Sequence, residues 1–301
     1  MTKIIMLVGL PASGKSMIAE NLSINQNAII YSSDKLREEL FSNVNEVTKN
    51  NELFTELHRR IKQDLLNGKN TIYDATNISY KKRKSFIESL NKISCEKICY
   101  LIATPYERCL EQNQLRERKV PEYVIERMYK SFYIPQIYEG WDTIEIIWDN
   151  TERFNTHTLF NGENGLNKIN QDNPNHTLTI GKHCLKCSQI CEEMSDDFEL
   201  SMAALYHDIG KRFTKQFENS KGEDTDIAHY YQHHLVSAYD SLFYLNYLDT
   251  ETILKITNFI QWHMYPFFIK SDKTKDKFIR LVGREFYNKL MILHEADKKA
   301  K

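Results

Sequence analysis

The sequence has little of what marks membrane proteins or disulfide-rich secreted proteins. No stretch of its 301 residues approaches the roughly 18 consecutive apolar residues that a membrane span needs. Six cysteines in a chain of this length do not suggest a disulfide framework. The first apolar run is only as long as a strand, so we expect neither a signal peptide nor association with a membrane.

The chain also lacks an excess of positive or negative charge. The chain has 40 Lys and Arg against 41 Asp and Glu, which gives a net charge of −1. Bulk charge therefore does not argue for a nucleic-acid partner, and any such partner must be held by local patches. A chain of this length has room for about two domains, each with its own core.

What the sequence does contain is a phosphate-binding loop near its start. Residues 9–16 read GLPASGKS, which fits G-x-x-x-x-G-K-[ST], and they lie between an apolar strand-like run at 4–8 and a helix-like segment at 17–22. Such a loop turns backbone N–H groups toward a phosphate at a helix N-terminus. The lysine reaches the β- and γ-phosphates, and the Ser hydroxyl holds Mg²⁺. The residues expected to bind Mg²⁺ and ATP are Gly9, Ala12, Ser13, Gly14, Lys15 and Ser16.

The order of the remaining segments predicts two domains. Over residues 1–150, strand-like and helix-like segments alternate, which predicts an α/β domain whose parallel sheet has helices on both faces. Residues 151–175 are rich in Asn, Gly and Thr, and we interpret them as a linker. Residues 176–301 are expected to be all α-helical. The expected strands are 3–9, 28–33, 70–74, 97–103 and 143–148, and the expected helices include 35–41, 51–67 and 80–91.

Two carboxylates follow strands of the predicted sheet, at the edge where such sheets bind ligands. Asp34 is a candidate to take the proton of a phosphate acceptor, and Arg37, one helical turn later, a candidate to bind a substrate phosphate. Asp34 also suits the N-cap of the helix at 35–41. Asp74 is a candidate to order the metal shell around the nucleotide, or equally an N-cap or turn carboxylate.

A later cationic segment suits a lid over the nucleotide. Arg116 and Arg118 precede Val120-Pro121, and cations on such a segment would stabilise a phosphoryl transition state. Surface ion pairs with neighbouring glutamates explain Arg118 equally well.

Together, these motifs make most of residues 1–150 resemble the 5′-hydroxyl polynucleotide kinases of RNA and DNA repair. The resemblance implies that Asp34 activates the 5′-OH, that Arg37 contacts the substrate phosphate, and that Arg116 contacts the transferring group. The family includes relatives that act on small molecules, so the reaction is better specified than the acceptor.

The second half carries histidines and carboxylates on several expected helices. His207 and Asp208 lie within an apolar helix-like run, where an unpaired carboxylate would be costly. This donor set suits a hard or borderline divalent metal, which activates water for attack on phosphorus. Lys211, one turn later, could bind a substrate phosphate.

This arrangement resembles the HD phosphohydrolase superfamily. The resemblance covers essentially all of the second half and implies a divalent transition metal such as Mn²⁺, Co²⁺ or Ni²⁺. It assigns His183, His207, Asp208 and Asp297 to one metal, and His233 and His263 to a second metal or to the substrate phosphate. Where relatives commonly have Gly-His-Glu, this chain has Gln232-His233-His234, and we prefer His233 as the residue facing the site.

Two further groups in the second half allow two interpretations each. Three cysteines at helical spacing could form a core stripe or, less favourably, a zinc site, since no second pair completes the usual zinc spacing. Four aromatic residues could stack nucleobases or pack in a core. The cysteines are Cys184, Cys187 and Cys191, and the aromatic residues are Trp262, Tyr265, Phe267 and Phe268.

Two phosphorus-handling sites on one chain suggest linked substrates. We expect a cytoplasmic, bifunctional end-healing enzyme that acts on RNA or DNA with a 5′-OH end and also hydrolyses 2′,3′-cyclic phosphate or 3′-phosphate ends. A separate nucleic-acid ligase would seal the ends, and the sequence is compatible with a homo-oligomer. The alternatives are a small-molecule or nucleoside kinase fused to a nucleotide phosphohydrolase, and an ATP-binding regulatory module without turnover.

Overall fold

The computed structural model describes residues 1–42, 48–149 and 154–301, which form two compact units. The first unit comprises Met1–Met128 and Pro135–Asp149. The second comprises Tyr129–Ile134 and Asn150–Lys301. The predicted domain boundary at residues 150 and 151 lies outside the described residues.

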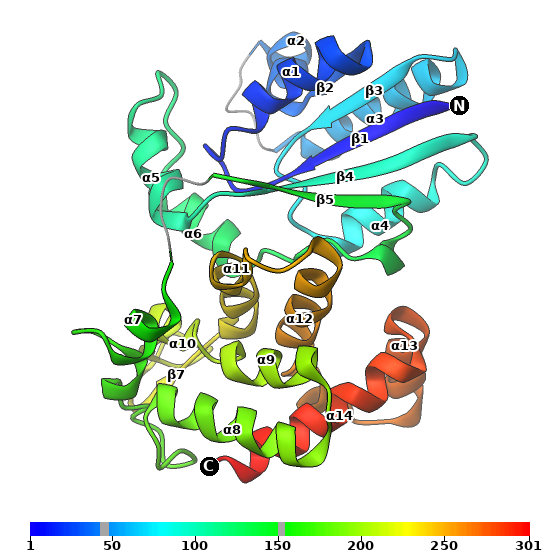
Figure 1. Ribbon diagram of the computed structural model, residues 1–301. Coiled ribbons are helices and arrows are strands. Elements are labelled where there is room, and N and C mark those ends of the chain that lie inside the picture. The colour runs from blue at the N-terminus through cyan, green and yellow to red at the C-terminus, as the bar shows by residue number, and fades with distance from the viewer. Residues whose placement is uncertain (43–47, 150–153) are drawn as a thin grey trace. The chain divides into compact units, whose positions relative to one another are not determined.

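The first unit is built on a five-stranded sheet, with strand order β2-β3-β1-β4-β5 and every neighbouring pair parallel (Figure 1). The central strand β1 is flanked on both sides, and residues 4–8 of it are fully buried, as the apolar run predicts. All five strands coincide with predicted ones to within two residues. Their bounds are β1 Thr2–Val8, β2 Ala28–Ser32, β3 Asn70–Asp74, β4 Cys95–Ala103 and β5 Thr143–Trp148.

Helices cover both faces of this sheet (Figure 1). Ile5 and Leu7 of β1 pack with Ala19 of α1 in one buried cluster. Because side chains alternate along a strand, Ile4 and Met6 point to the opposite face, and they too are buried. The predicted α/β architecture is therefore confirmed. The helices of this part of the chain are α1 Lys15–Gln26, α2 Ser33–Phe41, α3 Asn50–Leu66, α4 Tyr80–Glu88, α5 Tyr106–Gln114, α6 Glu122–Lys130 and the short 3₁₀ helix η1 Ile137–Glu139.

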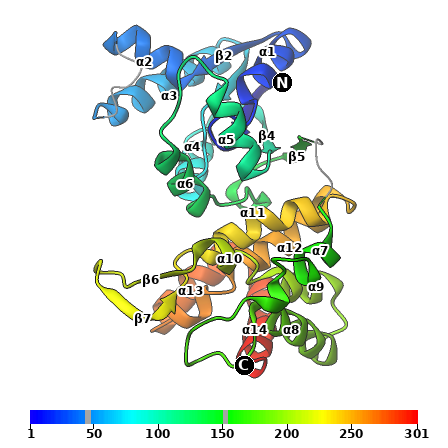
Figure 2. The same ribbon diagram turned by 90° about the vertical axis from the view of Figure 1, so that its left-hand side faces the viewer.

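The second unit is helical, as predicted, but it also contains a two-stranded antiparallel hairpin. Strands β6 (Gln216–Glu218) and β7 (Asp224–His229) project from the helices of this unit (Figure 2). The turn between them includes Gly222 at φ +82°, a conformation that favours glycine. The helices are α7 Thr156–Asn161, α8 Ile180–Met194, α9 Phe198–Tyr206, α10 Lys211–Thr214, α11 His233–Leu245, α12 Thr250–Trp262, α13 Asp272–Val282 and α14 Arg284–Lys299, with 3₁₀ turns η2 Leu166–Lys168 and η3 Tyr265–Phe268.

The three cysteines of α8 lie in the core of this unit. Cys184, Cys187 and Cys191 are all fully buried on one helix face. Burial raises the pKa of the Cys184 thiol to about 12, so this sulfur stays protonated. The structure therefore favours the core stripe over a zinc site.

The segment interpreted as a linker begins at residues 151–153, which lie outside the described residues, and its remainder is packed into the second unit. Asn155 caps α7 by accepting a hydrogen bond from the backbone of Thr158. Farther along, the backbone N–H of Ala228 donates to the carbonyl of Asp172 at 2.8 Å, which ties this segment to β7. Over the described ranges, no helix combines the length and apolar character that crossing a membrane requires.

Candidate active sites in the two units

The phosphate-binding loop lies between the end of β1 and the start of α1. Gly14, the N-cap of α1, has φ +83°, which lets the loop turn into the helix without strain. A Cβ on Gly9 would lie 2.7 Å from Ser13 Oγ and 3.2 Å from the carbonyl oxygen of Ile102, so the tight space here favours glycine. The loop therefore has the strand–loop–helix form of a phosphate cradle.

Two side chains of α1 connect the loop to the sheet. Lys15 is buried, and its Nζ donates to the backbone carbonyl of Leu10 and to Ser13 Oγ at 3.3 Å. Ser16 Oγ donates to Asp74 Oδ2 at 3.0 Å. Burial lowers the pKa of Lys15 to about 8 and raises the pKa of Asp74. Burial therefore destabilises the charged form of Lys15, which still keeps its proton below about pH 8, and a bound polyanion would stabilise that charge.

The hydroxyl of Ser16 and the carboxylate of Asp74 are hard oxygen donors of the kind that Mg²⁺ prefers. Asp74 is the last residue of β3, and the next helix, α4, has Ser79 as its N-cap. The structure thus excludes the N-cap interpretation of Asp74 and places its carboxylate beside the phosphate loop.

Asp34 lies in the first turn of α2, whose N-cap is Ser32, so it is not the N-cap that the sequence also allowed. Its half-exposed carboxylate lies 3.1 Å from Arg118 Nη1, so Asp34 is a partner of this cation. Arg37 is buried, and its Nη1 donates to Asn50 Oδ1 of α3 at 2.8 Å. Arg116 is exposed, and its charge, like those of Asp34 and Asp74, acts on Lys15.

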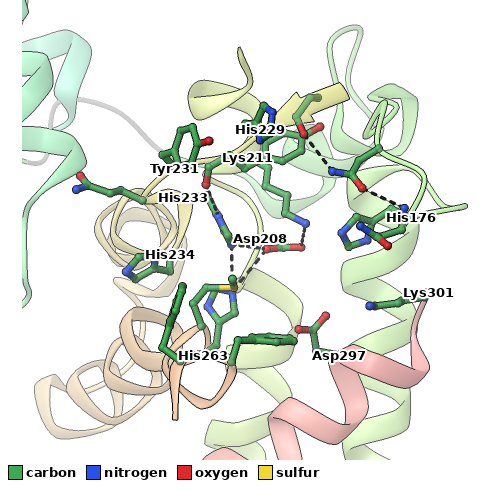
Figure 3. A pocket seen from close by; sticks show the side chains of 18 residues that line it. His176, Asp208, Lys211, His229, Tyr231, His233, His234, His263, Asp297 and Lys301 are labelled. Carbon is green, nitrogen blue, oxygen red and sulfur yellow. Dashed lines mark hydrogen bonds and ion pairs between the residues drawn. The ribbon is translucent and has the colours of Figure 1, made fainter. Parts of the chain in front are cut away.

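The second unit brings six of the predicted residues into one buried cluster from five helices. Figure 3 shows four of them, Asp208, His233, His263 and Asp297. His183 comes from α8, His207 and Asp208 from the end of α9, His233 from the start of α11, His263 from the end of α12 and Asp297 from α14. Around His183, the Nε2 atom lies 3.1 Å from Asp297 Oδ1, 3.3 Å from Asp208 Oδ2 and 3.2 Å from His207 Nε2. Around His233, the Nε2 atom lies 3.1 Å from Asp208 Oδ1 and 3.2 Å from His263 Nε2.

Three of these imidazoles are oriented by backbone carbonyl groups that precede them in the chain. The Nδ1 atoms of His207, His233 and His263 each lie 2.7 Å from the carbonyl oxygen three residues earlier. A proton on Nδ1 is donated to that carbonyl oxygen. The Nε2 atom is then free to accept a proton or to bind a cation in the cluster. His233 therefore faces the cluster. The next residue, His234, is different: burial and the nearby His233 lower its pKa to about 3.

The carboxylates control the charge of the cluster. Burial alone would raise the pKa of Asp208, but the cationic His207 and Lys211 outweigh it and hold this pKa well below the ordinary value. Burial alone would lower the pKa of His207, but Asp208 and Asp297 outweigh it and raise this pKa well above the ordinary value. Without a metal, protons on the imidazoles balance the negative charge of the carboxylates. A bound metal cation would take over that role and displace these protons.

The donor set fits a divalent metal. Two overlapping groups have ligand atoms within 4.8 Å of one another, and they share His207. Imidazole and carboxylate together suit borderline cations such as Mn²⁺, Co²⁺ or Zn²⁺. One group is His183, His207 and Asp297, and the other is His207, Asp208 and His263.

Lys211 is also buried beside the cluster, and the sequence analysis missed one of its partners. Its Nζ lies 2.6 Å from Asp208 Oδ2 and donates to Gln171 Oε1 at 2.8 Å. Gln171 belongs to the segment interpreted as a linker. Its composition of turn-forming residues concealed its contact with the site.

His176, from the same segment, was missed as well. Its ring packs edge-on against His183 with centroids 5.5 Å apart, and burial lowers its pKa to about 4. Its buried Nδ1 has no hydrogen-bond partner within residues 1–42, 48–149 and 154–301. A further histidine seven positions before His183 was the signal available in the sequence. With Asp208, Lys211, His233 and His263, it lines a cavity of about 530 Å³ (Figure 3).

Comparison with known proteins identifies two domain families. The family described as AAA domain matches residues 4–135, and the HD domain family matches residues 180–300. A curated relative, the L-seryl-tRNA(Sec) kinase of Methanococcus maripaludis, is 29% identical over 187 residues, which cover 59% of this chain and 68% of the relative.

Similar solved structures include a gluconokinase from Sinorhizobium meliloti and the Pnkp1/Rnl/Hen1 RNA repair complex. The gluconokinase has a TM-score of 0.38 and 13% identity, over 50% of this chain and 84% of its own. The repair complex has a TM-score of 0.39 and 21% identity, over 42% of each chain. Similarity at this level does not bear on activity.

Proposed function

We propose that this chain, which joins a P-loop kinase domain to an HD domain, heals the two ends of a broken polynucleotide. Its kinase domain would phosphorylate a 5′-OH end with Mg²⁺-ATP, and its HD domain would hydrolyse a 2′,3′-cyclic phosphate or 3′-phosphate end. The observation that carries the proposal is that the first unit holds a phosphate-binding loop with Lys15, and the second holds a buried cluster of histidines and carboxylates around Asp208. Because a strand break has two ends, two such sites on one chain suit a single substrate.

In the kinase site, Lys15 binds the β- and γ-phosphates, and Asp34 accepts the proton of the attacking hydroxyl. Arg118 would have to leave Asp34 before a hydroxyl could reach it. An exposed ion pair of this kind contributes about 0–1 kcal/mol, so substrate binding can displace Arg118 at little cost. Arg37, held by Asn50, would contact a substrate phosphate, and Arg116 would contact the transferring group.

In the HD site, the six clustered side chains would hold one or two divalent cations. When bound, such a cation activates water and compensates the charge of the departing oxygen. Lys211 already lies against Asp208 at the cavity wall, where its ammonium group would bind a phosphate oxygen. The ligands would be His183, His207, Asp208, His233, His263 and Asp297.

The curated relative supports an RNA-linked acceptor, because its name makes L-seryl-tRNA its substrate. It also favours a second candidate, in which the acceptor hydroxyl belongs to the amino acid of a charged tRNA and not to a 5′ end. In both candidates the γ-phosphoryl group of ATP is transferred to a hydroxyl group. They differ only in the substrate that would present this hydroxyl group to Asp34 and Arg37.

The test is a substrate panel with the purified full chain. In the presence of Mg²⁺ and [γ-³²P]ATP, 5′-OH RNA, 5′-OH DNA, seryl-tRNA and free nucleosides compete as acceptors. Separately, 3′-end-labelled RNA with a 2′,3′-cyclic phosphate is incubated with Mg²⁺, Mn²⁺, Co²⁺ or Ni²⁺. Labelled 5′ ends and hydrolysed 3′ ends are the expected result. Labelling of seryl-tRNA or nucleosides in preference to 5′ ends would overturn the polynucleotide assignment.

End healing implies a partner and a compartment. A separate nucleic-acid ligase would join the healed ends, since neither site would form the phosphodiester bond. All six cysteines are buried free thiols, which suits work in the reducing cytoplasm.

A further inference from the structure

The cavity of the HD unit is lined by both charged and aromatic side chains. Asp208, Lys211 and Asp297 supply the charged groups of the site. Phe267 and Phe268 line the same cavity from η3, although their side chains are 45% and 62% exposed. Two adjacent exposed rings at the wall of a cavity offer apolar surface to a ligand that enters it.

The structure separates the four aromatic residues whose role the sequence left open. Trp262 is buried, and Tyr265 stacks on Phe278 with centroids 4.0 Å apart, so these two rings belong to the core. Phe267 and Phe268 do not share that environment. Phe267 is held edge-on against His294 with centroids 4.4 Å apart, which fixes the ring at the cavity wall.

The end of the β6–β7 hairpin provides another ring of the cavity. Tyr231 is 40% exposed and stacks on His229 with an interplanar angle of 4°. In Figure 3, Tyr231 and His229 lie at the side of the cavity away from Asp297. The stacked pair holds the tyrosine ring in one orientation before any ligand binds.

We propose that Tyr231, Phe267 and Phe268 form a nucleobase subsite, so that the HD domain takes a phosphate attached to a nucleoside. The charged side chains of the cavity suit the phosphate, and its exposed rings suit the flat face of a base. A nucleotide carries both groups next to each other, and a cavity of about 530 Å³ lies within the usual range for small-molecule sites. A partner protein's side chain would match the rings but not the buried cluster.

This inference rests on the proposed function and narrows its substrate class. Base stacking depends on ring area more than on hydrogen-bonding edges, so all four bases should be accepted, and purines preferred. The subsite would distinguish nucleic-acid ends from sugar phosphates, which lack an aromatic group.

The experiment compares two substrates that differ only in the base. One is adenosine 2′,3′-cyclic phosphate, and the other is the same cyclic phosphate on methyl riboside. Both are assayed with the full chain and Mn²⁺, with Tyr231→Ala, with Phe268→Ala, and with Phe198→Ala as a control that removes an exposed ring outside the cavity. We expect each cavity variant to raise the KM for the adenosine substrate about 5- to 100-fold and to leave the abasic KM unchanged.

A second readout does not depend on turnover. 2-Aminopurine riboside 3′-phosphate loses fluorescence when its base stacks, so wild type and Phe198→Ala should quench it, and Phe268→Ala should not. Circular dichroism checks that each variant is folded.

The outcomes separate the two proposals. Equal KM values for both substrates in wild type, with no quenching, would overturn the base subsite while leaving the phosphoesterase intact. Quenching without hydrolysis of either substrate would support the subsite and refute the proposed phosphoesterase. If the chain does not quench 2-aminopurine, and another purified protein binds it through these exposed rings, the rings are a docking surface for a partner. That result would also overturn the base subsite.

Discussion

Replacing Lys15 with methionine should stabilise the first unit while abolishing its use of ATP. Lys15 is buried, and desolvation lowers its pKa from 10.5 to about 8. That difference corresponds to about 3 kcal/mol that disfavours the folded unit near pH 7. Methionine has a similar length and no charge, so it removes this cost. It also forfeits the hydrogen bonds to Leu10 and Ser13, each contributing about 1 kcal/mol, and the expected net gain is about 1–2 kcal/mol.

The pH dependence gives this prediction a distinctive sign. In the folded chain Lys15 loses its proton near pH 8, whereas the unfolded chain keeps it until about pH 10.5. The unfolded state therefore binds more protons between these values, and the stability contributed by this residue in wild type rises with pH. The advantage of Lys15→Met should be fully present below pH 8 and should disappear as the pH approaches 10.5.

The assay measures urea unfolding at a series of pH values from 7 to 10, with tryptophan fluorescence as the signal. Because the chain has two units, a Trp262→Phe background confines the signal to Trp141 and Trp148 of the first unit. Lys15→Arg is the matched control, since it keeps a buried charge and should give no gain. A Lys15→Met unit no more stable than wild type at pH 7, with an unchanged pH profile, would refute the proposed desolvation of Lys15.

Three further changes test other parts of the account. Gly210→Ala should abolish phosphoester hydrolysis and leave phosphorylation intact, because its Cβ would lie 2.5 Å from the carbonyl oxygen of His233; initial rates at both sites measure this. Arg37→Ala should raise the KM for oligonucleotide ends about tenfold and the KM for ATP by much less; equal effects would argue against a substrate-phosphate role. Gln171→Ala should raise the KM for cyclic phosphate several-fold without changing bound metal, because Lys211 loses a positioning acceptor; loss of metal by elemental analysis would contradict that role.

Local sequence signals were sufficient to predict the strands and the phosphate-binding loop of the first unit. Its strands are apolar runs followed by turn residues, and these periodic segments form β1 to β5 in the expected places. The phosphate loop could be identified from GLPASGKS alone, because the loop is formed by consecutive residues and Gly14 supplies the positive φ at its turn into α1. What the sequence could not decide were contacts between distant segments, such as the pairing of Arg118 with Asp34.

The second unit shows the same division. The resemblance assigned six metal-type residues, and the structure brings all six together. Gln171 and His176 were missed because a polar segment rich in turn-forming residues suits a linker and a packed cavity wall equally well. The hairpin of β6 and β7 was missed because its strands are short, polar and largely exposed, so they carry no apolar alternation.

One measurement tests the central claim directly. A single RNA with a 5′-OH end and a 2′,3′-cyclic phosphate end is incubated with ATP, Mg²⁺ and Mn²⁺, and both ends are read for wild type, Lys15→Ala and Asp208→Ala. We predict that wild type converts both ends, that Lys15→Ala converts only the 3′ end, and that Asp208→Ala converts only the 5′ end. Loss of both activities in either folded variant, or a wild type that leaves both ends untouched, would contradict two independent phosphorus sites on one end-healing chain.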